Sequence, residues 1–429
     1  MSLMPSASKG VRLHIGLFGR RNAGKSSLLN ALVHQSVSIV SPVPGTTTDP
    51  VEKPMELQPI GPVLFIDTAG LDDKGDLGML RMNRSQQVMQ RVDLALLVAD
   101  VAAWGELERG FIVDTQARGV PIVIALNKVD QQVVTATLRR ELDEKQCAWV
   151  ETSALTGSGI LALREALVVT AQSRLGEPPP LLADLVSAGE MAVLVVPIDK
   201  EAPKGRLILP QVQAIRELLD QDALCLVVKE RELRNALDRL SAPPKIVVTD
   251  SQAFLKVAAD TPPGVLMTSF SILFARAKGD LTAQVAGALA TDHLRPGAHV
   301  LVAEACTHHP IGEDIGRVKI PRWLTQQVGG ALQFEHVQGR DFPSDLSGYD
   351  LVIHCGACMW NRQSMQTRIQ LCRNAGVPIT NYGLIIAYSL GILERALEPF
   401  PAALEFYRNQ KRNLAPPCKP APTVLEVGR

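Results

Sequence analysis

Gly19-Arg-Arg-Asn-Ala-Gly24-Lys25-Ser26 is the stretch that decides the fold of the first part of the chain, because it fits the phosphate-binding pattern GxxxxGK[ST]. An apolar segment, Leu13–Phe18, precedes it, and a helical pattern, Ser27–Val33, follows it. This strand–loop–helix order predicts a loop whose amides and helix N-terminus surround phosphates. Lys25 is expected to neutralise the β- and γ-phosphates and Ser26 to ligate Mg²⁺. The predicted phosphate-binding residues are Gly19, Asn22, Ala23, Gly24, Lys25, Ser26 and Ser27.

Two further segments extend the phosphate site. Asp67-Thr-Ala-Gly70 ends an apolar strand, Val63–Ile66, which predicts that Asp67 lies near Mg²⁺, through water, and that the Gly70 amide faces the γ-phosphate. Pro44-Gly-Thr-Thr47-Thr-Asp49 is rich in turn residues, which predicts a mobile switch whose Thr47 reaches Mg²⁺.

Base recognition is predicted from two segments that follow later strands. In Asn127-Lys128-Val-Asp130, the Asp130 carboxylate can accept both the N1–H and the N2 amino group of guanine, whereas adenine offers no such pair of donors. Ser153-Ala154 would supply a backbone N–H to guanine O6. Each tetrapeptide alone could be a chance match, but all the motifs occur in working order at strand ends, which predicts a GTP-binding enzyme that uses Mg²⁺.

Leu71 follows this Asp67–Gly70 segment, at the position where many GTPases place a water-orienting glutamine. Leucine cannot orient water, so intrinsic hydrolysis should be slow or should use another group. The segments Gly19–Asn22 and Gly45–Asp49 resemble the TrmE–Era group of GTPases. The resemblance implies that Asn22 helps to hold an activating K⁺ ion; the alternative is that Asn22 only makes hydrogen bonds within the loop.

Composition and the N-terminal sequence argue against several classes of protein. The 429 residues contain 44 Lys plus Arg and 44 Asp plus Glu, so the basic surplus typical of nucleic-acid-binding proteins is missing. The chain has no apolar run of about eighteen residues, which argues against a transmembrane helix. Its N-terminal stretch MSLMPSASKG lacks the apolar core of a secretory signal. We therefore expect a cytoplasmic protein with no nucleic-acid or membrane partner.

Apolar strands alternate with amphipathic helices along the chain, which predicts an α/β fold with parallel sheets. We expect a small-GTPase domain at 8–175, a Pro-rich linker at 176–180, and two further α/β domains at 185–262 and 263–415. The expected strands are 13–19, 63–67, 94–100, 121–127, 148–152, 193–197, 224–228, 245–249, 299–305, 332–336, 350–354 and 377–380. Helices are expected at 211–219 and 230–240, with the last one near 384–397.

A second constellation consists of Cys306-Thr-His308 and His354-Cys355-Gly-Ala-Cys358, each at the end of a predicted strand. Since ligands bind at the carboxyl ends of parallel strands, the two segments can converge on one site. Three thiolates with histidine suit either a Cys₃His zinc site or a [4Fe–4S] cluster with one iron left to another ligand. The spacing does not choose between these metals.

Together, the GTPase motifs and the cysteine pattern resemble the HydF family of [FeFe]-hydrogenase maturation GTPases. Three further segments carry the resemblance: Ala202–Pro210, Thr268–Phe274 and Cys306–Gly316. It implies a dimerisation domain in the middle and an iron–sulfur cluster-binding domain at the end, with a [4Fe–4S] cluster on Cys306, Cys355 and Cys358.

The same resemblance implies a homodimeric scaffold. Such a protein accepts a transient di-iron precursor from two radical-SAM maturases and delivers it to the apo-[FeFe]-hydrogenase, with GTP regulating partner association. His308, His354 and Glu304 are the candidates for a fourth iron ligand or for hydrogen bonds around the cluster. Two alternatives stay open at this point: an Era- or TrmE-type GTPase that acts on the ribosome or tRNA, and a GTPase with a structural zinc site.

Overall fold

The computed structural model describes residues 12–33, 51–68, 70–72, 87–175, 179–197, 207–305, 314–339 and 341–414. The chain divides into two compact units. The first comprises Met1–Pro179 with Cys358–Gln370, and the second comprises Pro180–Ala357 with Leu371–Arg429. In the part of the chain that the structure describes, no helix is long and apolar enough to cross a membrane.

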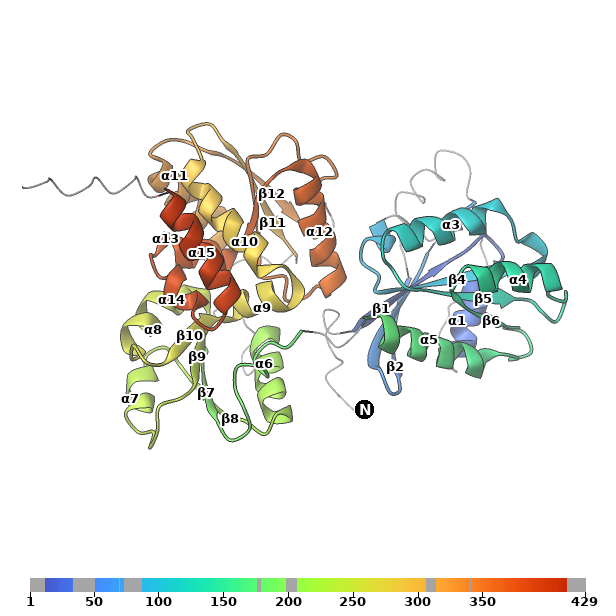
Figure 1. Ribbon diagram of the computed structural model, residues 1–429, viewed down its shortest axis with the longest axis horizontal. Coiled ribbons are helices and arrows are strands. Elements are labelled where there is room, and N and C mark those ends of the chain that lie inside the picture. The colour runs from blue at the N-terminus through green and yellow to red at the C-terminus, as the bar shows by residue number, and fades with distance from the viewer. Residues whose placement is uncertain are drawn as a thin grey trace, which may run out of the picture. The chain divides into compact units, whose positions relative to one another are not determined.

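The first unit is built on a six-stranded sheet of order β2-β3-β1-β4-β5-β6 (Figure 1). Its central strands are nearly continuous apolar runs, which is what a parallel sheet covered on both faces requires. All neighbouring strands run parallel except β2, which is antiparallel to β3. The strands are β1 (Leu13–Phe18), β2 (Val51–Leu57), β3 (Gly61–Asp67), β4 (Leu94–Asp100), β5 (Ile122–Asn127) and β6 (Ala148–Glu151).

Helices cover both faces of this sheet. The core on one face contains Leu28 and Leu32 of α1 with Leu163 and Leu167 of α5, and the core on the other face receives α3 and α4. In Figure 1, α3 lies above the sheet and α1 and α5 lie below it. The helices are α1 (Lys25–Val33), η2 (Val101–Ala103), α3 (Glu106–Ala117), α4 (Ala136–Glu144) and α5 (Ile160–Leu175).

Sequence analysis predicted five strands of this sheet and missed β2. The missed strand carries Glu52, Lys53, Pro54 and Glu56, and most of its residues are at least partly exposed. Proline and charged residues are typical of edge strands, because an edge strand needs neither a complete hydrogen-bond ladder nor two buried faces. The sheet is therefore parallel as predicted except at this edge, where β2 is antiparallel to β3.

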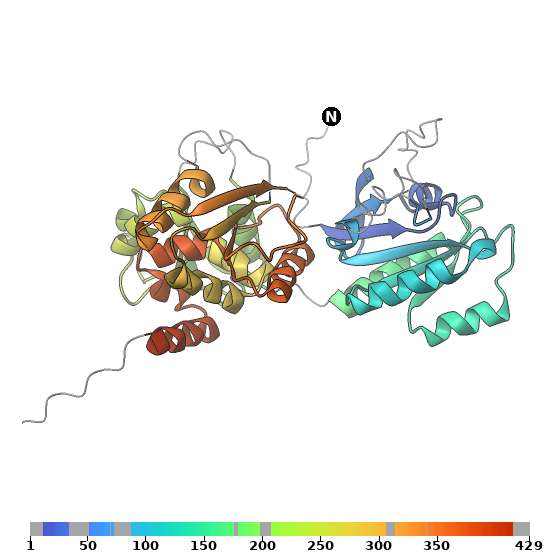
Figure 2. The same cartoon turned by 90° about the horizontal axis from the view of Figure 1, so that it is seen from above.

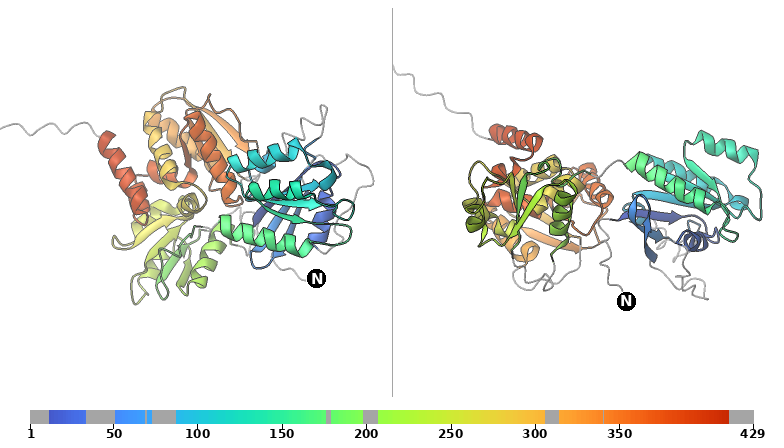
Figure 3. Two further views of the ribbon diagram at one scale, coloured as in Figure 1. Left: turned by 45° about the vertical axis from the view of Figure 1, so that its right-hand side comes forward. Right: turned by 90° about the horizontal axis from the view of Figure 1, so that it is seen from below.

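Two four-stranded parallel sheets form the second unit, with the orders β10-β9-β7-β8 and β12-β11-β13-β14. Figures 2 and 3 show them from other directions. The first sheet contains β7 (Met191–Val195), β8 (Leu224–Val228), β9 (Ile246–Thr249) and β10 (Leu266–Ser269). The second contains β11 (His299–Glu304), β12 (Gln333–Gln338), β13 (Leu351–His354) and β14 (Ile379–Asn381).

Helices between and after these strands complete the chain. They are α6 (Leu209–Asp220), α7 (Leu233–Leu237), η3 (Ser251–Ala253), α8 (Phe254–Asp260), α9 (Phe270–Lys278), α10 (Leu281–Leu289), η4 (Ala290–His293), η5 (Ile315–Lys319), α11 (Ile320–Val328), α12 (Arg362–Ala375), α13 (Tyr382–Ser389), α14 (Leu393–Leu397) and α15 (Pro401–Leu414). All seven strands predicted for this half are present, with ends shifted by a few residues.

The predicted single helix near 384–397 was wrong. The chain forms α13 and α14 there, and Gly391 between them has a left-handed φ of 72° that ends the first helix. The final helix, α15, was not predicted. The sheet of β7 also extends to β10, past residue 262, where the sequence analysis placed the end of the middle domain. The domain limits themselves stay a prediction.

Candidate nucleotide and metal sites

The loop between β1 and α1 has the geometry of a phosphate-binding loop. Lys25 Nζ donates to the carbonyl oxygens of Gly19 and Arg20, both at 2.9 Å, so its ammonium lies against the loop. Gly24 has a φ of 93°, and a Cβ there would overlap the side-chain amide of Asn127. Only glycine permits this close approach. Asn22 also adopts a left-handed φ, 59°.

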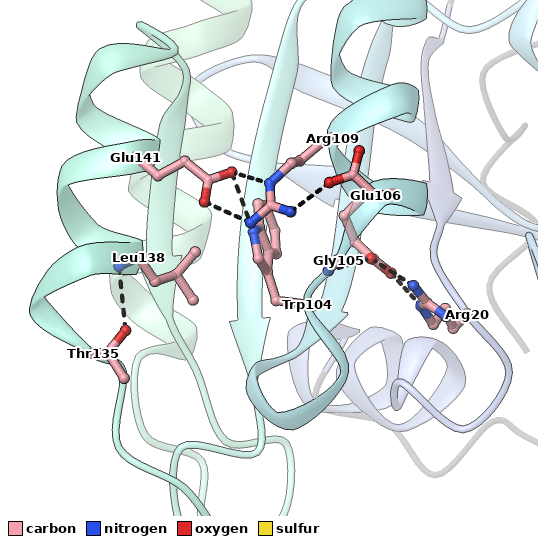
Figure 4. Close-up of polar contacts among 9 residues, drawn as sticks. Arg20, Trp104, Gly105, Glu106, Arg109, Thr135, Leu138 and Glu141 are labelled. Carbon is pink, nitrogen blue, oxygen red and sulfur yellow. Dashed lines mark hydrogen bonds and ion pairs between the residues drawn. The ribbon is translucent and has the colours of Figure 1, made fainter.

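Arg20 ties this loop to α3, a contact that the sequence did not reveal. Its guanidinium makes two parallel hydrogen bonds with the Glu108 carboxylate, at 2.7 and 3.0 Å (Figure 4). The Glu108 side chain is only 2% exposed, and it also accepts the Gly105 amide at 2.9 Å. A bidentate pair of this kind fixes orientation as well as charge. Nearby, Arg109 of α3 pairs with Glu141 of α4 in the same way, which joins the two helices (Figure 4).

Ser26 and Asp67 meet where the magnesium ion was predicted. Ser26 Oγ donates to Asp67 Oδ2 at 2.7 Å, whereas Asp67 Oδ1 is buried without a hydrogen-bond partner. Burial raises the pKa of Asp67, although the Ser26 hydrogen bond and the charge of Lys25 oppose the shift. A buried carboxylate oxygen with no partner suits a cation or its bound water, so these residues fit Mg²⁺. The predicted ligand Thr47 lies outside the described residues.

Asn127 joins the motifs that were predicted to recognise the base. Its Nδ2 donates to the Ala23 carbonyl at 2.9 Å, and its Oδ1 accepts the Ala154 amide at 3.1 Å. Lys128 pairs with Asp100 at 2.7 Å, and Asp130 is exposed at the end of the same segment. The structure therefore brings the phosphate loop and both base motifs to the carboxyl edge of one sheet. Asp100 was missed because no motif marks it.

Other predicted nucleotide residues lie at the same edge. Ser153 is fully buried, and its hydroxyl accepts the Thr156 amide at 3.2 Å. A Cβ on Gly70 would overlap Arg21, so the Gly70 backbone lies against the phosphate loop. The Leu71 amide donates to the Gly19 carbonyl at 3.1 Å, while its side chain packs on the core beneath α3. Leu71 thus acts as a packing residue, which agrees with its inability to orient water.

Cys355 lies at the end of β13, beside the end of β11. Its amide donates to the Ala303 carbonyl at 2.9 Å, and its sulfur accepts the Ala305 amide at 3.1 Å. Ala305 directly precedes Cys306, so the two strand ends meet as predicted up to the last described residue of this segment. Cys306 and His308 themselves lie outside the described residues. Among the residues that are described, no group of three or more His, Cys, Asp and Glu side chains could hold a metal ion.

Glu304 and His354 are both buried near Cys355. The Glu304 carboxylate accepts the Tyr382 hydroxyl and the Gln338 amide, both at 3.1 Å. His354 Nδ1 donates to the Cys355 carbonyl at 2.8 Å, an orientation that supports the backbone of the cysteine turn. Cys358 is partly exposed. The amide hydrogen bond to the Cys355 sulfur suits a thiolate-ligated metal centre, and it fits zinc and an iron–sulfur cluster equally.

Family comparisons identify all three parts of the chain. The model of a 50S ribosome-binding GTPase matches residues 14–128. The hydrogen maturase F dimerization domain matches residues 181–279, and the hydrogen maturase F tetramerization domain matches residues 282–399. The last two matches together span more than half of the chain. The chain belongs to the hydrogen maturase F family. Its N-terminal part is a P-loop GTPase domain, which implies binding of GTP and Mg²⁺.

Curated relatives match the GTPase domain. The tRNA modification GTPase MnmE of Roseiflexus sp. is 37% identical over 191 residues, which is 41% of this chain and 40% of that protein. GTPase Der of Wolinella succinogenes is 40% identical over 124 residues, 28% of this chain and 26% of Der. The chain therefore spans two fifths or less of these relatives. The solved G domain of the T. maritima FeoB iron transporter is 26% identical with a TM-score of 0.30, covering 38% of this chain and 99% of that one.

Proposed function

We propose that the protein is a GTP-regulated scaffold that carries a [4Fe–4S] cluster on Cys306, Cys355 and Cys358. In this proposal it accepts a di-iron precursor from two radical-SAM maturases and delivers it to the apo-[FeFe]-hydrogenase. Membership of the hydrogen maturase F family supports the scaffold role. The observation that carries the metal site is the hydrogen bond from the Ala305 amide to the Cys355 sulfur, because it places the residue before Cys306 against a second proposed ligand.

The cluster would supply one iron that is open to the cargo. The chain's own residues would hold and shield the cluster. Glu304 is buried, and hydrogen bonds from Tyr382 and Gln338 fix its carboxylate at the end of β11. His354 is fully buried and donates to backbone, which favours a supporting role over ligation. Neither assignment is needed for the test of the three cysteines.

Anaerobic purification with iron and sulfide analysis tests the cluster. We expect iron and sulfide in the wild-type protein and loss of most of both after Cys306→Ser, Cys355→Ser or Cys358→Ser. Cys372→Ser is a matched control, because Cys372 is a fully buried residue of α12 outside the CxxC segment. Unchanged iron in Cys355→Ser would contradict the proposal. Stoichiometric zinc in a colourless wild-type protein would instead support the structural zinc site.

Self-association is the second element of the proposal, and we expect a homodimer. Strand β8 lies at one edge of its sheet, within the segment matched by the dimerization model. Leu224 and Val227 on this strand are 53% and 42% exposed. An apolar edge strand pairs readily with a second chain. Leu224→Asp should therefore shift the protein toward monomer in size-exclusion chromatography with light scattering, whereas Leu255→Asp, an equally exposed site on α8, should leave it unchanged.

Activation by K⁺ is the third element. The left-handed backbone of Asn22 turns this residue within the phosphate loop, and the resemblance to cation-activated GTPases supports a role in holding the ion. GTP turnover should be faster in KCl than in NaCl at equal ionic strength. Asn22→Ala should remove the difference between the two salts. Equal rates of the wild-type protein in both salts would leave Asn22 as a loop residue only.

A further inference from the structure

Lys278, the last residue of α9, is a buried cation that the proposed function does not yet use. It is only 8% exposed, and its ammonium lies 4.6 Å from the centre of the Phe274 ring. Lysine is almost never buried without a specific partner, because removing its charge from water is costly. The position of this charge therefore requires an explanation.

The ammonium donates to the carbonyl oxygen of Ala357 at 3.2 Å. Ala357 is the third residue of the segment Cys355-Gly-Ala-Cys358, is 2% exposed and has a left-handed φ of 49°. A residue with a side chain adopts this conformation only rarely, so its surroundings must hold it there. The hydrogen bond from Lys278 acts on the peptide that leads directly into Cys358.

The same face of α9 contacts this turn at a second point. A Cβ on Gly356 would lie 3.5 Å from Ser271 Oγ, so Gly356 packs against the first turn of the helix. Ser271 and Lys278 are separated by about two helical turns and share one face. The Ser271 carbonyl in turn accepts the Asn381 amide at 2.9 Å. Helix α9 thus forms a fixed support for the turn between the two cysteines.

Two buried acidic residues, Glu304 and Asp314, flank in the sequence the segment that contains Cys306. Glu304 is buried, and Asp314 is 9% exposed. The Tyr382 hydroxyl donates to Glu304 at 3.1 Å, and the Ala305 amide donates to the Cys355 sulfur at 3.1 Å, so the carboxylate and the thiol lie at neighbouring strand ends. Thiolate ligands would add more negative charge. A buried site of net negative charge is stable only when a cation lies close to it.

We propose that Lys278 is a positioning residue of the metal site. It holds the Gly356–Ala357 turn in the conformation that presents both thiols, and its charge offsets the negative charge of the ligands. The inference rests on the proposed metal-binding function. Since Lys278 lies in the segment matched by the dimerization model and the turn lies in the tetramerization match, it also makes the metal site depend on a helix of the neighbouring domain.

The test compares variants of the full-length protein after anaerobic reconstitution with iron and sulfide. Lys278→Met removes the charge and the hydrogen bond at nearly constant length, whereas Lys278→Arg keeps a cationic donor. Substitution of a residue that orients metal ligands typically lowers metal affinity about 10- to 100-fold. We expect Lys278→Met to lower the affinity for iron by about this factor in a chelator competition. Lys278→Arg should restore most of the affinity. Lys256→Met is the control, because Lys256 is an exposed lysine paired with Asp260.

A second readout separates the charge from the fold. In a redox titration followed by electron paramagnetic resonance, the cluster of a neutral variant should have a lower midpoint potential, because a lost cation disfavours the reduced state. If Lys278→Met fails to fold, the same measurement is made on Lys278→Gln, which is also neutral, and compared with Lys278→Arg. Equal iron retention and equal potential in the neutral and cationic variants would overturn the inference. A wild-type protein without iron or sulfide would instead refute the proposed function, so the two failures are distinguishable.

Discussion

The nucleotide site and the cysteine site differ in how they are held. In the nucleotide site the motif residues bind one another: Asn127 contacts Ala23 and Ala154, and Ser26 contacts Asp67. In the cysteine site His354 supports the turn from within the motif, but Lys278, Ser271 and the backbone of β11 also hold it from outside the two cysteine segments. Sequence separation does not explain the difference, since Asn127 is 104 positions from Ala23 and Lys278 is 79 positions from Ala357. Support that lies within a motif can be predicted from the sequence, whereas support from other elements, such as Lys278 or Glu108, cannot.

The largest expected effect distinguishes the nucleotide site from the cysteine site. Lys25→Ala removes the charge that we expect to face the β- and γ-phosphates, and GTP turnover should fall by about 10²-fold or more. Iron content should stay at the wild-type level, because the variant touches no residue of the cysteine turn. Hydrogenase activation in a maturation assay should nevertheless fall if GTP regulates partner exchange.

Cys355→Ser is the reciprocal variant and should keep near-normal GTP turnover while activating no hydrogenase. Full activation by the Lys25 variant would show that nucleotide is dispensable. Full activation by the Cys355 variant would remove the metal site from the function.

A smaller effect is expected at Asp130, which is predicted to bind the guanine base. Asp130→Asn removes a carboxylate that can accept two guanine donors, and a hydrogen bond to a charged group contributes about 1.5–3 kcal/mol. GTP affinity should fall by roughly 10- to 100-fold, and xanthosine triphosphate should bind better than GTP. Equilibrium titration with a fluorescent nucleotide measures both. Normal GTP affinity in this variant would rule out guanine recognition by Asp130.

The Glu108 side chain supports the phosphate loop from outside its motif, and its removal should have a smaller effect. Glu108→Ala breaks the bidentate pair with Arg20 and leaves the Gly105 amide without its acceptor. Because Arg20 is 30% exposed, the loss should be about 1–2 kcal/mol of unfolding free energy, below that of a fully buried pair. Asp114→Ala is the control, since its pair with Arg118 is exposed on both sides and should contribute under about 1 kcal/mol. Equal losses in denaturant unfolding of the two variants would show that the Arg20 pair has no special role.

The smallest effect is expected at Leu71. Its side chain packs on the core and contributes no polar group, so Leu71→Met should change GTP turnover by less than about threefold, as volume-conserving substitutions are tolerated. The measurement is steady-state phosphate release at saturating GTP. A tenfold loss would indicate that this side chain shapes the site for the attacking water after all.

Most strands and the motifs of the nucleotide site were predicted from local chemistry in the sequence. The glycine-rich loop, Asp67 and the segment from Asn127 to Asp130 were predicted, because phosphate, Mg²⁺ and guanine each require particular groups at the ends of apolar strands. The predicted strands were also confirmed, since buried parallel strands are continuous apolar runs. The edge strand β2 and the division of α13 from α14 escaped prediction, because one lacks an apolar run and the other depends on the backbone angle of Gly391.

Only the tertiary structure decided which side chains support the sites. Nothing in the local sequence marks Glu108 as the partner of Arg20, or Lys278 as the donor to Ala357. Such contacts arise when separate elements pack, and a lone glutamate or lysine in a helix reads as an exposed residue until its burial is known. The sequence by itself therefore predicted a site for GTP and Mg²⁺ and a cysteine-rich metal site. Packing of α3 and α9 decided how firmly each site is held, because burial strengthens a charge interaction that water would otherwise screen.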